Sequence, residues 1–133
     1  MAFRTKGKFE MSYSDRLAEI FVRQRTFMDA LREHDKFPEF PVDMTTKQGQ
    51  RLVGECSWNL IKELAEANVT LKNKMHRLTE ASDFDREHYV EELVDTLSFF
   101  IELCIMSDIG ADELHSGYVK KNAEVHRRLE EGY

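Results

Sequence analysis

Residues that break or cross-link regular structure are scarce in this chain. The two prolines stand close together, at positions 38 and 41, and the two cysteines, Cys56 and Cys104, lie apart within apolar helical patterns. Neither cysteine has a CxxC partner, which leaves zinc and redox roles unsupported. The N-terminus lacks the apolar run of a signal peptide, so we expect a reducing, cytoplasmic location.

Long apolar runs and an excess of basic residues are also missing. The most apolar stretch, 97–106, is interrupted by Ser98 and Glu102 and is well short of the roughly 20 residues that span a bilayer, so we expect no membrane contact. The 25 acidic and 19 basic residues give a net charge of −6, which argues against binding to nucleic acid polymers. An apolar share of 41% is enough for one core, and the length predicts a single domain over 1–133.

Helical periodicity dominates the pattern that is present. Residues 1–12 show little of it and are expected to form a flexible arm. We predict helices over about 14–34, 45–68 with a weaker continuation to 74, 82–109, and 112–130. The expected helix caps are Ser14, then Thr45 or Thr46, then Ser82 or Asp85, and Gly110 is expected to end the third helix. No strand-like alternation occurs, so the predicted class is all-α and resembles a four-helix bundle.

The third predicted helix is apolar on two faces. One face, which we expect to be core, carries Val90, Leu93, Val94, Leu97, Ile101 and Cys104. The second begins with Glu92 and Asp95 and continues through Phe99, with Glu102 on its flank. A helix with two apolar faces is packed on both sides, which predicts that a partner chain completes the core of a homodimer or homotetramer.

Two pairs of acids lie one helical turn apart, each beside an apolar stripe. Glu63 and Glu66 belong to the second predicted helix, Glu92 and Asp95 to the third. If these helices pack antiparallel, four carboxylates face one another and repel, and a hard cation removes the conflict. Mg²⁺ suits a site whose ligands are all oxygens. Either pair alone would arise by chance on a solvated face, but their joint occurrence favours a metal site.

The spacing of these acids is similar to a known signature. Glu63-Leu-Ala-Glu66, then 25 residues, then Glu92-Leu-Val-Asp95 resembles the ExxE…ExxD motif of the all-α nucleoside triphosphate pyrophosphohydrolases, the superfamily of MazG and the dimeric dUTPases. The ending Tyr118-Val-Lys120-Lys121-Asn122, with Arg127, Arg128 and Gly132-Tyr133 after it, resembles the YxxKN…R…GY ending of dimeric dUTPases and their phage relatives. The resemblance covers about 17–133.

This resemblance implies Mg²⁺-dependent hydrolysis of a nucleoside triphosphate to the monophosphate and pyrophosphate, with dUTP or a related pyrimidine nucleotide favoured. The four acids of that family hold Mg²⁺ while water attacks the α-phosphorus, so it implies metal-binding and catalytic roles for Glu63, Glu66, Glu92 and Asp95. One of the two glutamates on the second helix would orient the water. The substrate-binding residues that it implies are Lys121, Asn122 and Arg128 for phosphate or sugar oxygens, and Gln24, Trp58 and Asn59 for the base.

Several alternatives stay open. Trp58 would serve equally well in a core or at a dimer interface. The cations Lys72, Lys74 and Arg77 would either approach the phosphates or simply favour a solvated helix end. The five histidines are interpreted as surface or packing residues, and a di-iron site is excluded because no Glu-x-x-His pair occurs. A non-catalytic helical dimer, acting as an adaptor or regulatory protein, would need no cation at the acids.

Overall fold

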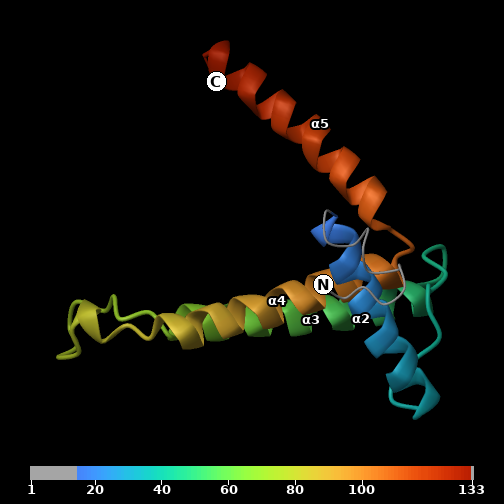
Figure 1. Cartoon of the computed structure of the whole chain (residues 1–133), viewed down its shortest axis with the longest axis horizontal. Helices are drawn as coiled ribbons and strands as arrows, with labels where there is room; N and C mark the ends of the chain where they lie inside the picture. Colours follow the sequence, from blue (N-terminus) through green and yellow to red (C-terminus); the bar gives the residue numbers. More distant parts are fainter. Residues whose placement is uncertain (1–14, 133) are drawn as a thin grey trace, which may run out of the picture. The chain divides into compact units, whose positions relative to one another are not determined.

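The computed structural model describes residues 15–132, and all regular structure in that range is helical (Figure 1). Its α-helices are α2 (Arg16–Glu33), α3 (Lys47–Val69), α4 (Arg86–Met106) and α5 (Ala111–Glu130), with a short 3₁₀ helix η2 (Ala81–Asp83) before α4. The all-α class is therefore confirmed for these residues, whereas the bundle arrangement stays a prediction. The expected arm 1–12 lies outside the described range. Across 15–132, no helix combines the length and the apolarity that crossing a bilayer requires.

Side-chain caps begin three of the helices. The side chains of Asp15, Thr46 and Asp85 each accept a hydrogen bond from a backbone N–H in the first turn of α2, α3 and α4. Thr46 and Asp85 were among the expected caps, and they are confirmed. Ser14, the predicted cap of α2, lies outside the described residues, and Asp15 takes this role instead. The C-terminal end of α3 is Val69, so the weaker continuation to residue 74 was wrong.

The end of α4 differs from the prediction. This helix stops at Met106, with Ser107 as its C-cap, and the residue that turns the chain is Asp108, whose φ is 61°. Aspartate tolerates this left-handed conformation better than most residues do, so glycine is not required there. Gly110 is instead the N-cap of α5.

The chain divides into two compact units. The described residues of the first are 15–38 and 108–132, and they contain α2 and α5, which contact each other. Phe21 and Met28 are its buried apolar residues on α2. The second comprises Glu39–Ser107 and contains α3 and α4. The prediction of a single domain over 1–133 stays a prediction.

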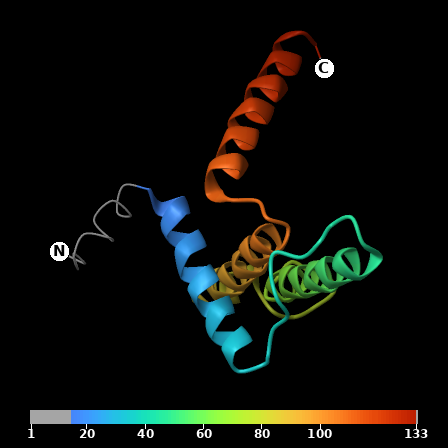
Figure 2. The ribbon, with the colours of Figure 1, turned by 90° about the vertical axis from the view of Figure 1, so that its right-hand side faces the viewer.

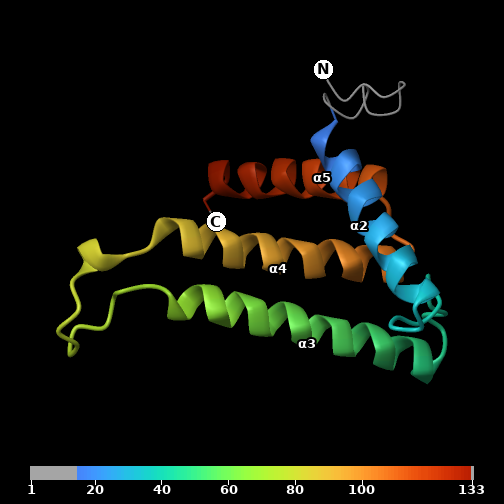
Figure 3. The same ribbon diagram turned by 60° about the horizontal axis from the view of Figure 1, so that its bottom comes forward.

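In the second unit α3 and α4 form an antiparallel hairpin. They lie side by side along their length in Figures 1 and 3, and Figure 2 shows them nearly end-on as neighbours. The buried residues on these helices include Cys56 and Ala67 of α3 and Ile101, Cys104, Ile105 and Met106 of α4. Gly49 lets the first turn of α3 approach the preceding loop, because a Cβ there would collide with the Asp43 carbonyl. The buried side chains of α3 and α4 thus pack against each other along the hairpin.

Part of the expected core of α4 is not buried. Of the face predicted as core, Ile101 and Cys104 are buried, but Val90, Leu93, Val94 and Leu97 are between 38% and 52% exposed. Within this unit α3 covers one side of α4, and apolar residues turned away from that side keep their contact with solvent. The prediction for Glu102 was wrong in the opposite sense: this residue was predicted to lie on the flank of the second apolar face, and it is buried, with only 7% of its surface exposed.

Candidate metal centre

Three of the four predicted carboxylates converge across the hairpin. Glu63 on α3 and Glu92 and Asp95 on α4 each offer one carboxylate oxygen, and these atoms all lie within 4.8 Å of one another. Glu92 and Asp95 share a face of α4 because residues three apart are neighbours on a helix. The antiparallel pairing of α3 with α4 then brings Glu63 opposite them.

The cluster is partly shielded from water. The side chains of Glu63 and Glu92 are only 15% and 14% exposed. Partial burial raises the pKa of Glu63 above its usual value, and the neighbouring carboxylates of Glu66, Asp95 and Glu92 raise it further. The Lys62 ammonium, 3.9 Å from the Glu63 carboxylate, opposes this shift. A cation among these carboxylates would relieve the repulsion that contributes to the raised pKa of Glu63.

Glu66 lies beside the three-carboxylate group without being part of it. Its side chain is 46% exposed, and its carboxylate lies 3.6 Å from the Lys62 ammonium. Glu66 is still close enough to raise the pKa of Glu63 through its charge. Glu66 therefore adjoins the group at the end of α3, where it faces an open space.

That space is a cavity of about 400 Å³ between the end of α3 and the start of α4. Its described lining consists of Glu66, Val69, Thr70, Lys72, Asp85, His88 and Glu92. Since Glu92 also belongs to the three-carboxylate group, the cavity is continuous with that group. The sequence indicated Lys72 only as part of a basic cluster.

His88 is a neighbour of the group that the sequence analysis missed. Its Nε2 lies 3.2 Å from a carboxylate oxygen of Glu92, one helical turn further along α4. The side chain is 51% exposed, which confirms its interpretation as a surface residue, although that interpretation gave it no place beside Glu92. The i,i+4 spacing to a predicted metal ligand was a signal that could have identified it.

The other predicted site residues are spread over both units. Trp58 is 70% exposed on α3, so the alternative that it is a core residue of the chain is wrong, while base stacking and an interface role stay open. Asn59 is exposed beside it. The remaining four belong to the first unit: Gln24, half-buried on α2, and Lys121, Asn122 and Arg128, all exposed on α5. Their roles at a nucleotide stay predictions.

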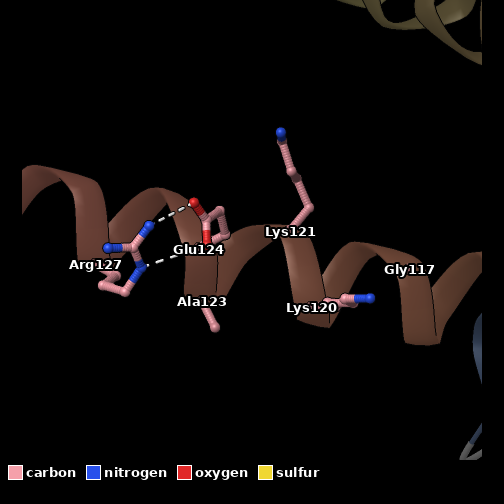
Figure 4. A pocket seen from close by; sticks show the side chains of 6 residues that line it. All are labelled: Gly117, Lys120, Lys121, Ala123, Glu124 and Arg127. Atoms are coloured by element: carbon pink, nitrogen blue, oxygen red, sulfur yellow. Dashed lines mark hydrogen bonds and ion pairs between the residues drawn. The ribbon is translucent and has the colours of Figure 1, made fainter. Parts of the chain in front are cut away.

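The cations of α5 fall into two groups. Arg127 and Arg128 both donate hydrogen bonds to Glu124, at 2.8 Å in each case, and they lower the pKa of its carboxyl. Lys120 and Lys121 extend from the helix with no drawn partner (Figure 4). A hollow of about 560 Å³ runs past them, and all its described lining residues come from α5. It is therefore a stretch of open helix surface.

A further acid, outside the three-carboxylate group, lies along the same seam of the hairpin. Glu102 on α4 accepts a hydrogen bond from the Cys56 thiol at 3.3 Å. Burial raises the pKa of the Glu102 carboxyl, and it raises that of Cys56 to about 12 with help from the Glu102 charge. Both groups are buried, so they form a structural contact inside the hairpin.

The donor chemistry of the three-carboxylate group suits a hard divalent cation. All its ligands are carboxylate oxygens, which Mg²⁺ prefers, and the buried thiols of Cys56 and Cys104 are not among them. Comparison with protein-family models, with curated proteins and with solved structures finds no match to this chain.

Proposed function

We propose that this chain is a Mg²⁺-dependent nucleoside triphosphate pyrophosphohydrolase of the all-α superfamily, with dUTP or a related pyrimidine nucleotide as its substrate. The observation that carries the proposal is the convergence of Glu63, Glu92 and Asp95 to within 4.8 Å, with Glu66 adjoining them. These are the same four residues whose ExxE…ExxD spacing resembles that superfamily. An acidic pair on a solvated helix face would not need a counterpart on the neighbouring helix.

Glu63, Glu92 and Asp95 would hold the cation, with Glu66 beside them. When bound, Mg²⁺ supplies charge neutralisation for the phosphates and lowers the pKa of a coordinated water. The protein's part is to hold its carboxylates ready in one place, since a positioned donor set needs no reorganisation when the nucleotide arrives. The antiparallel hairpin provides this rigidity.

The proposed hydrolysis requires a side chain that accepts a proton from the attacking water. A water oxygen forms a bond to the α-phosphorus, and the bond from that phosphorus to the bridging oxygen breaks, so that pyrophosphate leaves with the electron pair. The proton of the water needs an acceptor. Glu66 is suited to this role, because it adjoins the three carboxylates that would hold the cation without being one of them.

Exposed apolar side chains support two further parts of the proposal. Trp58, being 70% exposed, is free to stack on a base, and Asn59 beside it offers an amide. The half-exposed row from Val90 to Leu97 on α4 is suited to contact with a second copy, in a homodimer or homotetramer. Gln24, Lys121, Asn122 and Arg128 complete the proposed substrate site, and we propose a cytoplasmic location.

A nucleotide panel tests the activity. Each of the common nucleoside and deoxynucleoside triphosphates is incubated with the protein and Mg²⁺, and monophosphate and pyrophosphate are quantified. We expect equal amounts of both from a pyrimidine deoxynucleotide, and loss of turnover in Glu63→Gln and Asp95→Asn. Glu91→Gln is the matched control, since it removes an exposed charge from α4 outside the cluster. Release of orthophosphate in place of pyrophosphate would contradict the proposal.

The non-catalytic helical dimer remains the second candidate, and the exposed apolar residues of α3 and α4 are the observation that favours it. Thermal melting separates the two candidates. An enzyme gains stability from Mg²⁺ together with a non-hydrolysable nucleotide, since both bind only the folded state. An adaptor would melt at the same temperature with and without them.

A further inference from the structure

The cavity beside the three-carboxylate group contains one feature that the proposed metal ligands do not explain. Lys72, in the segment that follows α3, lines the cavity and is half-buried. Within residues 15–132 no carboxylate lies close enough to form an ion pair with it. Since no described carboxylate neutralises this ammonium, the position is suited to an anion that arrives from outside.

The other walls of the cavity restrict which anion this is. Glu66, Asp85 and Glu92 are acidic, so a bare anion would be repelled from them. An anion that carries divalent cations meets both needs, because the cations face the carboxylates while its free oxygens face Lys72. Phosphate groups bound to Mg²⁺ have this character.

The lining also restricts which part of a nucleotide would enter. Val69 is the one aliphatic residue among the described lining residues, the imidazole of His88 is the one aromatic ring, and no Phe, Tyr or Trp is among them. Four of the seven described lining residues are charged, namely Glu66, Lys72, Asp85 and Glu92, which suits metal-bound phosphates better than an uncharged base. Along α3 the order is Trp58, Glu63 and Glu66, and Lys72 follows the end of the helix. The acids therefore lie between the exposed ring of Trp58 and the cavity, so Trp58 and Lys72 lie on opposite sides of them.

We infer that this cavity receives the pyrophosphate part of the substrate, with Lys72 as the side chain that binds its outer phosphate. This inference rests on the proposed function, because the proposed hydrolysis of a nucleoside triphosphate is what makes pyrophosphate the expected ligand. It gives the nucleotide a direction along the hairpin: the base lies toward Trp58, the α-phosphorus lies at the carboxylates, and the two outer phosphates lie beyond Glu92. Lys72 is then a residue that sets affinity for the leaving group.

The chain offers a matched pair of variants for the test. Lys72→Ala and Lys74→Ala remove the same charge from the same segment, but Lys74 is exposed and does not line the cavity. Binding of inorganic pyrophosphate in the presence of Mg²⁺ is measured by titration calorimetry for the wild type and both variants. We expect the Lys72 variant to bind about tenfold more weakly, the ratio that one charge-assisted hydrogen bond supports, and the Lys74 variant to match the wild type. Lys72→Gln, of similar length, should weaken binding like Lys72→Ala.

Two results would overturn the inference: a wild-type chain that does not bind Mg²⁺-pyrophosphate, and a Lys72 variant that binds it as tightly as the Lys74 variant does. The nucleotide panel keeps this outcome separate from the proposed function. If turnover is absent while Lys72 still sets pyrophosphate affinity, the proposed function fails and the cavity assignment stands. If turnover is present and Lys72 has no effect on pyrophosphate affinity or on product inhibition, the cavity assignment fails alone.

Discussion

Glu102 is a buried carboxyl group whose only recorded partner within residues 15–132 is a thiol. It is 7% exposed, and the Cys56 thiol, a weak donor, lies 3.3 Å from its carboxylate. The substitution Glu102→Gln keeps the length of the side chain and an oxygen acceptor for the thiol, and it removes the negative charge. The variant therefore isolates the free-energy cost of keeping an ionised group inside the hairpin.

The sign of the effect follows from the pKa shift. Burial raises the pKa of Glu102 in the folded chain above its usual value of 4.5. A carboxyl group with a raised pKa contributes most to stability below its unfolded pKa, and this contribution is lost as the pH rises through the folded pKa. The wild type should thus lose stability between mildly acidic and neutral pH, and Glu102→Gln should lose less.

The size of the effect follows from the poor solvation of the group. A buried polar group that is left incompletely hydrogen-bonded costs about 1–3 kcal/mol, and more when it is charged. The thiol bond offsets part of that cost, so we expect Glu102→Gln to be more stable than the wild type by about 1 kcal/mol at pH 8. For a chain of this length this corresponds to a rise in melting temperature of roughly 3–5 °C.

Thermal and urea unfolding, followed by circular dichroism at several pH values between 4 and 8, would measure this difference. Glu91→Gln is the control, because it removes an exposed charge from the same helix. The reasoning would be refuted if Glu102→Gln were less stable than the wild type at pH 8. It would also be refuted if the gain were the same at pH 4 as at pH 8.

The remaining expectations concern single side chains. His88→Asn should weaken Mg²⁺ binding up to about tenfold in calorimetry, because Glu92 loses a neighbour 3.2 Å away that orients it; unchanged affinity would separate His88 from the site. Trp58→Ala should raise KM for the preferred nucleotide about tenfold or more with little effect on folding, as loss of one stacked ring would do; unaltered discrimination among bases would leave only an interface role. Ile101→Ala should destabilise the chain by about 2–5 kcal/mol in urea unfolding, since this side chain is 1% exposed. A loss below about 0.5 kcal/mol, typical of surface positions, would contradict the packing of the hairpin.

Local patterns were sufficient to predict the helices and the pairing of the acids. A cap such as Thr46 or Asp85 acts on N–H groups within three residues, and the spacing of Glu92 and Asp95 puts them on one face of any helix. These features depend on neighbours in the chain, so the amino-acid order alone determines them. The same reasoning failed at the end of α4, because both aspartate and glycine tolerate the turn and the sequence does not say which one makes it.

The tertiary structure decided which side chains meet across the hairpin and which stay in water. Cys56 and Glu63 are seven positions apart on α3, and Asp95 and Glu102 are seven positions apart on α4. The antiparallel register that joins Glu63 to Asp95 therefore also joins Cys56 to Glu102. Periodicity could not reveal this, because it gives the face of one helix but not the height at which a second helix packs against it. The burial of Glu102, the exposure of Val94 and the cavity beside Glu92 all follow from that register, which is a property of two helices in contact.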